Sequence, residues 1–455
     1  MKQYITFHKD GRFNAPDPVP SANHLPDWFQ ALELAIESLP IPSDKTAKLC
    51  MPLNDAMKSG WLLRAPCDLH MRKDDDGLDV SAQKAGAAVG LSPDQADRDN
   101  NSSFLFPECL VSSAHGIDSP AGYSTLVTQP LNRDEMRFTV PGMVVPTDEY
   151  DGTIQVPMHI EADAVQIEAG EPIAQVVPVA REDLSIETTA NSFKSGSKFE
   201  TMLHKTLRAS SRRKDVYRKD SWVPKPSTRI VEDPTEPTGD SGTATGKQPA
   251  SKDSRTGDRL ENDRTLAYYC SEERDGNLPA PTPATEHVPE WYSRRLSSID
   301  GLDSNQPTSE WIDAATSIGA IVPLPTRTSM QRTGGNQPLD VTTETEREPH
   351  QVQFAKKMGD AHPLVPASVV NLTTEWLIRP PSGCSVLVCS PFAHLQRYYR
   401  SYAGLADFDR YATTANTPGL FTERADEWTF PAQTPVSQHI PINRENIISV
   451  ATIEQ

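Results

Sequence analysis

The sequence has no uninterrupted apolar run of about 18 residues, the length that a membrane-spanning helix needs. Its first ten residues, MKQYITFHKD, lack the apolar core of a secretion signal. The six cysteines form no CxxC pair and show no metal-ligand spacing, so free and mostly buried thiols are expected. These absences argue against membrane and secretory classes, and they predict neither a metal site nor a cofactor.

Positive charge is also scarce. Lys and Arg total 44 against 62 Asp and Glu, which gives a net charge of −18. Nucleic-acid backbones are bound by positive surfaces, so nucleic acid is not an expected partner. An acidic balance of this kind is compatible with a halophilic host, where negative surfaces keep proteins soluble. Proline is abundant, with 40 residues against 24 glycines, as in β-rich folds joined by extended loops.

The strongest signal in the sequence is an internal repeat. Short segments of the first half recur in the same order in the second half, at offsets that drift between 258 and 278 residues and equal 261 for two of the matches. The matched pairs are 24–29 with 287–292, 55–60 with 313–319, 78–81 with 339–342, 117–127 with 378–388, 141–142 with 418–419, and 148–150 with 426–428. A period this long indicates a duplicated domain rather than a solenoid.

The repeat divides the chain into three parts. We expect a first domain at 1–195, a connecting region at 196–284 and a second, diverged domain at 285–455. Within the connecting region, residues 231–262 are rich in Pro, Thr, Ser, Gly, Asp and Lys and have almost no large apolar side chains. Such a composition buries too little surface to offset the entropy of ordering, so it predicts a long polar linker.

Strand patterns dominate the first domain. Apolar residues alternate with polar ones over 154–160, the pattern of a half-buried strand, and further strands are predicted at 165–167, 173–179 and 123–127. One helix is predicted at 26–37, behind an Asp cap. The predicted fold is therefore mainly β, with two tandem jelly-roll or β-barrel domains.

Four segments of the first domain resemble the motifs of the dUTPase and dCTP deaminase family. They are 65–69 (APCDL), 120–124 (PAGYS), the stretch 142–152 that contains Tyr150-Asp151-Gly152, and 170–177 (GEPIAQVV). Their order and spacing fit the family, and the resemblance covers about a quarter of the chain. It implies a dUTPase-like β-fold, usually trimeric, with a nucleotide site that holds a triphosphate and Mg²⁺.

The chemistry that this resemblance implies is not matched by the residues. Ala121 stands where the family has its phosphate-binding Arg, and Thr147 stands where its water-activating Asp belongs. Asp148 is one residue away from that position, and a one-residue slip in a strand reverses the face that a side chain points to. Asp68, Ser124, Thr147 and Asp148 are therefore interpreted as diverged nucleotide-site positions, and no catalytic residue is predicted.

A basic segment follows the first domain. Residues 194–229 carry eleven Lys and Arg against three Asp and Glu, a net charge of +8, so the remainder carries −26. Within this basic segment, a helix is predicted at 203–218. We expect the segment to pack on an acidic surface of a partner protein. The candidate interaction residues are Arg212, Arg213, Lys214, Tyr217 and Trp222.

Duplicated β-barrels without catalytic groups suit a structural or interaction protein. The pattern around the motifs also resembles uncharacterised proteins of tailed phages, which implies a virion component, of capsid decoration or turret type, assembled in the host cytoplasm. Its expected partners are other virion proteins and further copies of itself, as a trimer or a higher homo-oligomer. Two alternatives remain open: a nucleotide pyrophosphatase of dUTPase type, and a module that binds sugars or a host surface.

Overall fold

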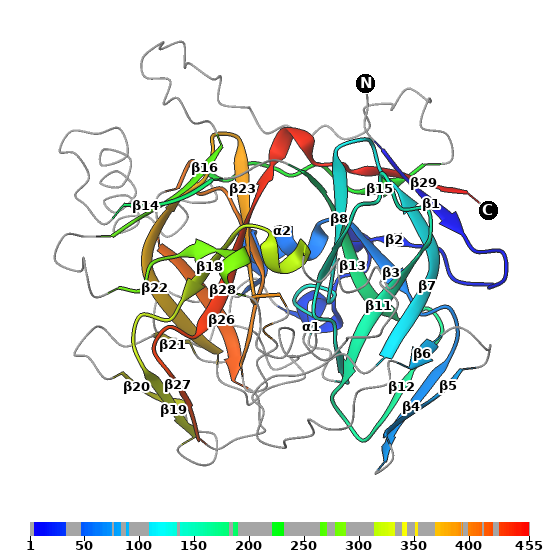
Figure 1. The fold of residues 1–455 in the computed structure, drawn as a ribbon, viewed down its shortest axis with the longest axis horizontal. Coiled ribbons are helices and arrows are strands. Elements are labelled where there is room, and N and C mark those ends of the chain that lie inside the picture. Colours follow the sequence, from blue (N-terminus) through cyan, green and yellow to red (C-terminus); the bar gives the residue numbers. More distant parts are fainter. Residues whose placement is uncertain are drawn as a thin grey trace, which may run out of the picture.

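The fold is described from a computed structural model, in which two β-rich copies stand side by side (Figure 1). The structure describes residues 4–32, 47–74, 77–82, 88–90, 109–133, 137–181, 185–189, 221–231, 264–270, 278–287, 314–332, 339–343, 351–353, 369–392, 394, 399–411, 414–421 and 427–454. The candidate helix at 203–218 lies outside these residues. Both chain ends lie at the same end of the molecule (Figure 1).

The first copy is built from short strands and two short helices. In chain order its elements are β1 (Ile5–Lys9), β2 (Val19–Pro20), η1 (Ser21–Asn23), α1 (Asp27–Ala31), η2 (Ala47–Leu49), α2 (Met51–Lys58), β3 (Trp61–Arg64), β4 (Leu69–Asp74), β5 (Gly77–Ala82), β6 (Ala88–Gly90), β7 (Cys109–Asp118), β8 (Tyr123–Thr128), β9 (Phe138–Thr139), β10 (Met143–Val145), β11 (Thr153–Ile160), β12 (Ala164–Ile167) and β13 (Pro172–Ala180). These strands form a large sheet β1-β7-β11-β9, a five-stranded sheet β10-β8-β13-β3-β2 and a three-stranded sheet β12-β4-β5.

The second copy repeats this plan. Its elements are β16 (Thr265–Tyr269), β17 (Thr282–Pro283), η6 (Ala284–Glu286), a short helix at 314–317, β18 (Ala320–Pro323), β19 (Thr328–Arg332), β20 (Leu339–Thr343), β21 (Gln351–Gln353), β22 (Val369–Arg379), β23 (Cys384–Cys389), β24 (Tyr399–Ser401), β25 (Gly404–Ala406), β26 (Thr414–Phe421), β27 (Glu427–Phe430), β28 (Pro435–Asn443) and η8 (Arg444–Asn446). The sheets β16-β22-β26-β24, β25-β23-β28-β18-β17 and β27-β19-β20 have the strand order of the first copy.

The prediction of a mainly β fold is confirmed. The four strands expected in the first copy are β11, β12, β13 and β8, each within one residue of its predicted limits. Of the predicted helix at 26–37, α1 forms over Asp27–Ala31, Leu32 is already extended, and residues 33–37 lie outside the described part. The six cysteines are free thiols, as expected.

The two copies exchange strands. β14 (Ser185–Thr189) follows the last strand of the first copy but pairs in parallel with β16 of the second copy. Conversely, β29 (Val450–Glu454) follows the last strand of the second copy and pairs in parallel with β1 of the first. β15 (Arg229–Ile230) then adds to β29. The region 196–284 therefore also supplies strands β15, β16 and β17 to the sheets.

The strand registers define which residues of the two copies correspond. Val145 pairs with Thr125, and Ala406 pairs with Val386, so the offset of 261 continues past the third motif. The counterpart of Asp148 is therefore Asp409, and the sequence match of 148–150 to 426–428 is wrong. That second segment leads into β27, the counterpart of β12. Short matches such as these recur by chance, whereas backbone pairing specifies equivalence.

The same comparison corrects two further matches. Residues 418–419 lie in β26, the counterpart of β11, and do not correspond to 141–142. Gly60 and Gly319 correspond, which aligns Asp55 with Ala314 rather than with Asp313. Both glycines have positive φ, and a Cβ would lie 1.9 Å from the Val176 carbonyl oxygen in the first case and 2.1 Å from that of His439 in the second. Only glycine fits such an approach.

A buried glutamine joins the five-stranded sheet to the helix in each copy. Gln175 Nε2 donates to the carbonyls of Ala56 and Ser59, at 3.1 and 2.6 Å, and its Oε1 accepts from Leu131 N at 2.9 Å. Gln438 makes the same three bonds, to Ala315, Ile318 and Phe392. These amides satisfy buried backbone groups that strand pairing leaves open.

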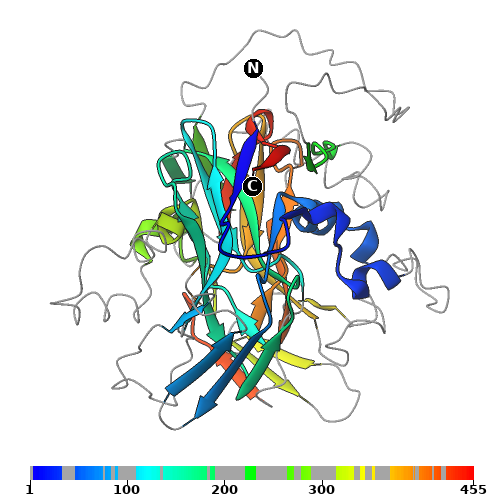
Figure 2. The same cartoon turned by 90° about the vertical axis from the view of Figure 1, so that its right-hand side faces the viewer.

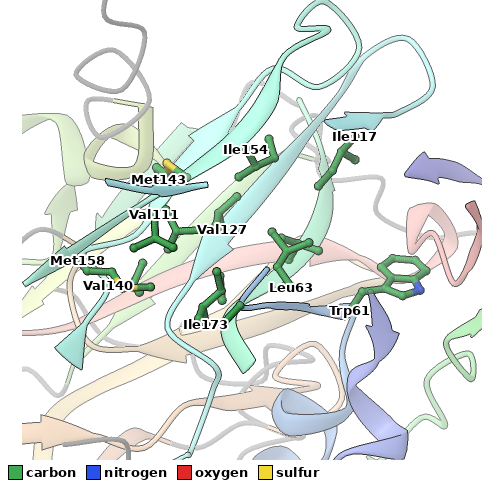
Figure 3. Packing of buried hydrophobic residues seen from close by; sticks show 14 of the residues in the cluster. Trp61, Leu63, Val111, Ile117, Val127, Val140, Met143, Ile154, Met158 and Ile173 are labelled. Carbon is green, nitrogen blue, oxygen red and sulfur yellow. The ribbon is translucent and has the colours of Figure 1, made fainter. Parts of the chain in front are cut away.

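The core of the first copy lies between its large and its five-stranded sheet (Figure 3). Ile154 and Met158 face it from β11, Leu63 from β3 and Val127 from β8, all fully buried. Each such side chain contributes about 1.5–3 kcal/mol when it is fully buried. This burial explains the period-two pattern in the sequence of β11.

A second apolar cluster forms the junction between the copies. Its members come largely in corresponding pairs, from the outer faces of the two five-stranded sheets and from the helices and turns beside them: Ala56 with Ala315, Leu126 with Leu387, Leu131 with Phe392, Val144 with Leu405, and Val179 with Ile442. Thr139 likewise contacts its own counterpart, Arg400, through a 2.8 Å hydrogen bond. Contacts between equivalent residues are the mark of an approximate twofold axis.

The two cores differ around one buried aromatic residue. In the first copy Phe7 packs edge-on against Trp61, with ring centroids 5.9 Å apart. In the second copy the corresponding position holds Tyr268, whose hydroxyl lies 3.0 Å from Nδ1 of the stacked His439. His439 is fully buried, and desolvation lowers its pKa to about 3. His394, also buried, has its pKa lowered to about 4, chiefly by desolvation.

These histidines predict acid sensitivity. Both are neutral in the folded chain at pH values where the unfolded chain is protonated, so unfolding takes up protons below pH 6.5. The free energy of unfolding should therefore fall as the pH drops from 6.5 toward 4, by up to about 1.4 kcal/mol per pH unit for each histidine. Urea denaturation at pH 7, 6 and 5 measures this slope.

The first copy supplies the control. The triple variant Tyr268→Phe, Ser437→Ala and His439→Val gives the second core the residues found at the corresponding positions of the first, where Phe7, Ala174 and Val176 stand. Below pH 6.5 the free energy of unfolding of this variant should fall less steeply with pH than that of the wild type, because one of the two histidines no longer contributes. An unchanged slope would show that His439 does not contribute.

Candidate functional site

The diverged nucleotide-site positions of the first copy gather at one end of β8 and β13. Thr147 follows β10, and its hydroxyl lies 2.7 Å from Ser119 Oγ and 2.9 Å from Thr125 Oγ1. Thr147 and Thr125 are buried, with exposed fractions of 1% and 0%. Three neutral hydroxyls thus fill the place where a water-activating carboxylate was expected. A threonine hydroxyl does not ionise near neutral pH and cannot serve there as a general base.

Asp148 is held in an ion pair beside these hydroxyls. Arg181, the residue after β13, donates from Nη1 to Asp148 Oδ1 at 2.5 Å, and the Gly122 amide donates to Oδ2 at 2.8 Å. Burial opposes ionisation of Asp148, but these hydrogen bonds and the Arg181 charge outweigh it and lower its pKa. The hydrogen bond to Asp148 in turn raises the pKa of Arg181.

Ser124 belongs to the same cluster. Its hydroxyl accepts from Arg181 Nη1 at 3.3 Å, and Arg181 also donates to the carbonyl of Tyr123 at 3.2 Å. Arg181 therefore ties the end of β13 to the beginning of β8 and to the loop after β10. Ser124 and Asp148 thus share Arg181, and Thr147 bonds to Ser119 and Thr125, so the polar groups of all three residues are already used in hydrogen bonds.

The second copy has an ion pair that corresponds to Asp148–Arg181, and we call the two pairs the Asp–Arg clasps. Arg444 binds Asp409 through Nη1 at 3.0 Å and Nη2 at 2.5 Å, and the Gly383 amide donates to Asp409 Oδ2 at 3.1 Å. Phe408 takes the place of Thr147 and Asp407 that of Pro146. Ser385 Oγ, the counterpart of Ser124 Oγ, donates to Asp407 Oδ1 at 2.6 Å.

Asp68 lies elsewhere. Its Oδ1 accepts from the Ala169 amide at 2.8 Å, in the turn that leads into the start of β13. Asp148 and Arg181 lie at the other end of that strand. At about 3.3 Å per residue, the nine residues of β13 separate these groups by about 30 Å. One chain therefore does not bring Asp68 and Asp148 to a common substrate.

Of the candidate interaction residues, the structure describes Trp222. Its Nε1 donates to Asp55 Oδ2 of the same chain at 2.7 Å. Trp222 thus bonds to a buried carboxylate of its own chain, and its contact with a partner protein stays a prediction. Arg212, Arg213, Lys214 and Tyr217 lie outside the described residues.

Sequence reasoning missed the arginines of both clasps. Arg181 and Arg444 each stand six residues after the bridging glutamine, Gln175 or Gln438. Aligning the repeat on these glutamines would have revealed both arginines. Lys225, whose ammonium lies 2.8 Å from Asp407 Oδ1, has no such signal, because the two residues are 182 positions apart in the chain.

Neither a metal site nor a membrane helix is found in the described part of the chain. Within it, no three His, Cys, Asp or Glu side chains are placed to hold a metal ion. No described helix is long and apolar enough to cross a membrane.

Comparison with solved structures finds nucleotide enzymes of low similarity. The chain is similar to the dUTPase of Staphylococcus bacteriophage 80alpha, with 11% identity, a TM-score of 0.21, and coverage of 43% of this chain and 92% of that one. The dUTPase of phage phi11 of S. aureus is 12% identical, with a TM-score of 0.19 and coverage of 36% of this chain and 97% of that one. The dCTP deaminase of Agrobacterium tumefaciens is 9% identical, with a TM-score of 0.29 and coverage of 91% of this chain and 93% of that one.

No protein-family model and no curated protein matches the chain.

The two clasps predict different coupling energies. In double-mutant cycles, Asp148→Ala with Arg181→Ala should give a coupling of about 1 kcal/mol or less, because the Arg181 side chain is 38% exposed. Asp409→Ala with Arg444→Ala should give a larger value, about 1–3 kcal/mol, since these side chains are 10% and 11% exposed. Urea unfolding measures both cycles. Equal couplings would contradict the assignment of the second clasp as the buried one.

Proposed function

We propose that this chain is a non-catalytic interaction protein with two dUTPase-like β units. The observation that carries the proposal is the buried hydroxyl cluster of Ser119, Thr125 and Thr147. Phosphoryl transfer in a dUTPase-type site needs a carboxylate to orient the attacking water. Thr147 in the first copy and Phe408 in the second offer none at that position.

The neighbouring carboxylates do not replace the missing one. Asp148 and Asp409 each accept two charge-assisted hydrogen bonds from an arginine and one from a glycine amide. A carboxylate held in this way is a weak base, because its partners stabilise the ionised form. These groups therefore serve to close the end of each barrel.

The finer role that we propose is that of a virion component, of capsid decoration or turret type, in a tailed virus. This role rests on the resemblance to tailed-phage proteins noted from the sequence. A structural role is favoured by the exchange of β14 and β29, which ties the two copies into one body. The partners would be other virion proteins and further copies of the chain, as a trimer or a higher oligomer.

A second candidate is a nucleotide pyrophosphatase of dUTPase type. It is favoured by the cluster of Ser124, Asp148 and Arg181 at one end of the first barrel. In that case, Asp68 would have to be supplied by another copy of the chain, since its own Asp68 lies about 30 Å from Asp148 along β13.

The first candidate predicts catalytic silence. Purified protein with Mg²⁺ should release no pyrophosphate from dUTP or dCTP above background, while the phage 80alpha dUTPase, run alongside, should. Turnover that Asp148→Ala abolishes and the matched Asp409→Ala leaves intact would establish the second candidate instead.

The virion role predicts that the chain is found in particles. Mass spectrometry of virus particles purified from cells that carry the gene should detect it in stoichiometric amounts. The control is the same particle preparation after a high-salt wash, which removes adsorbed host proteins held by exposed charges. Detection in the cell lysate together with absence from washed particles would refute the virion role and leave the non-catalytic assignment intact.

A further inference from the structure

A strap formed by residues 221–231 crosses from one copy to the other. Ser221 Oγ donates to the carbonyl of Arg410 in the second copy. Further along, the amides of Arg229 and Val231 donate to the carbonyls of Ser449 and Ala451, at the beginning of β29, at 2.8 Å each. β29 lies in the large sheet of the first copy. In Figure 1, β15 runs beside β29 near the chain ends.

Two carboxylates, one from each copy, hold the beginning of the strap. Lys225 Nζ lies 2.8 and 2.9 Å from the two oxygens of Asp407 and 3.6 Å from Asp55 Oδ2. The Val223 amide donates to Asp407 Oδ2 at 2.8 Å, and Trp222 Nε1 to Asp55 Oδ2 at 2.7 Å. Asp55 stands on α2 of the first copy, and Asp407 follows β25 of the second.

This site is buried. The side chains of Lys225, Asp55 and Asp407 are 10%, 8% and 0% exposed. A buried carboxylate is stable only with charged or hydrogen-bonding partners, and the strap supplies three of the donors that these two acids use. Ser385 and Arg444 supply further donors to Asp407, at 2.6 and 3.1 Å.

The acidic pair is not part of the duplicated design. The counterpart of Asp55 in the second copy is Ala314, and the counterpart of Asp407 in the first copy is Pro146. Neither carboxylate is repeated on the other side of the approximate twofold axis. The two acids thus occur together on only one of the two equivalent sides of the junction, and that side is the one that the strap covers.

We propose that Asp55 and Asp407 form a recognition site for a Trp-x-x-Lys segment, and that the strap is its internal ligand. The indole N–H selects one carboxylate and the ammonium bridges both. Because the acids belong to different copies, an occupied site locks the copies together on that side of the junction. This inference is independent of the proposed function, since it concerns a different set of residues.

The source of the ligand is the chain itself. Residues 190–220 and 232–263 join the strap to β14 and to the residue before β16. A connection of about 30 residues spans at most about 100 Å, so it reaches the site of its own chain with ease. Tethering gives such a ligand an effective concentration in the millimolar range, which favours occupation within one chain.

Hydrogen exchange on the full chain tests the lock. Trp222→Ala with Lys225→Ala should speed exchange of the amides of Val223 and 229–231 at least tenfold, while β7 and β22 stay protected. Arg229→Ala, an exposed change on the same strap, is the matched control and should leave the Val223 amide as slow as in the wild type. Unchanged exchange at Val223 in the double variant would overturn the proposal.

A peptide test then examines recognition. A synthetic peptide of residues 221–231 should bind the double variant at millimolar concentration or below, and should bind the wild type at least tenfold more weakly because the site is filled. Asp407→Asn added to the double variant, or Lys225→Ala in the peptide, should remove binding. Equal binding to wild type and double variant, or no binding to a double variant that keeps its protected β7 and β22, would overturn the proposal.

Discussion

Each five-stranded sheet buries one face against the core of its own copy and the other face against the second copy. The strands β8, β13, β23 and β28 are accordingly buried almost throughout, and their polar members are mostly Ser, Thr, Gln and His, which carry no charge when neutral. Gln175 and Gln438 are admitted because each satisfies three backbone groups there. Since this face is covered within one chain, any homo-oligomer has to be built from other surfaces.

The strand exchange adds a second constraint of a different kind. β14 and β29 each complete the sheet of the copy to which they are not directly connected. Backbone hydrogen bonds of a parallel pair do not depend on side chains, so they hold the copies in register even where the sequences have diverged. The apolar junction and the exchanged strands act together: one excludes water between the copies, and the other ties their outer edges.

Strands could be predicted from the sequence where one face of the strand is exposed to solvent. β11 showed the period-two pattern, and the repeat was visible in short matches. The sequence could not specify equivalence beyond 388, because residues 148–150 (DEY) share two identities with 426–428 (DEW) and also two with their true counterparts, 409–411 (DRY). Of the candidate site, the cluster around Thr147 and Asp148 was anticipated from motif order. The site of Asp55, Lys225 and Asp407 was not, since Lys225 is 170 residues from Asp55 and 182 residues from Asp407 and no local pattern joins them.

The two copies share three structural features although their sequences have diverged. The features common to both are the bridging glutamine, the close-approach glycine and the Asp–Arg clasp, and all three act on the backbone of the barrel. The position where a dUTPase-type site needs its carboxylate holds Thr147 in one copy and Phe408 in the other. The hydroxyl of Thr147 and the phenyl ring of Phe408 have no chemistry in common, but each fills this buried position without placing a charge there. Divergence of this kind supports the proposal that the duplicated barrel serves here as architecture. The acidic pair on one side of the junction is then the chain's own addition to that architecture.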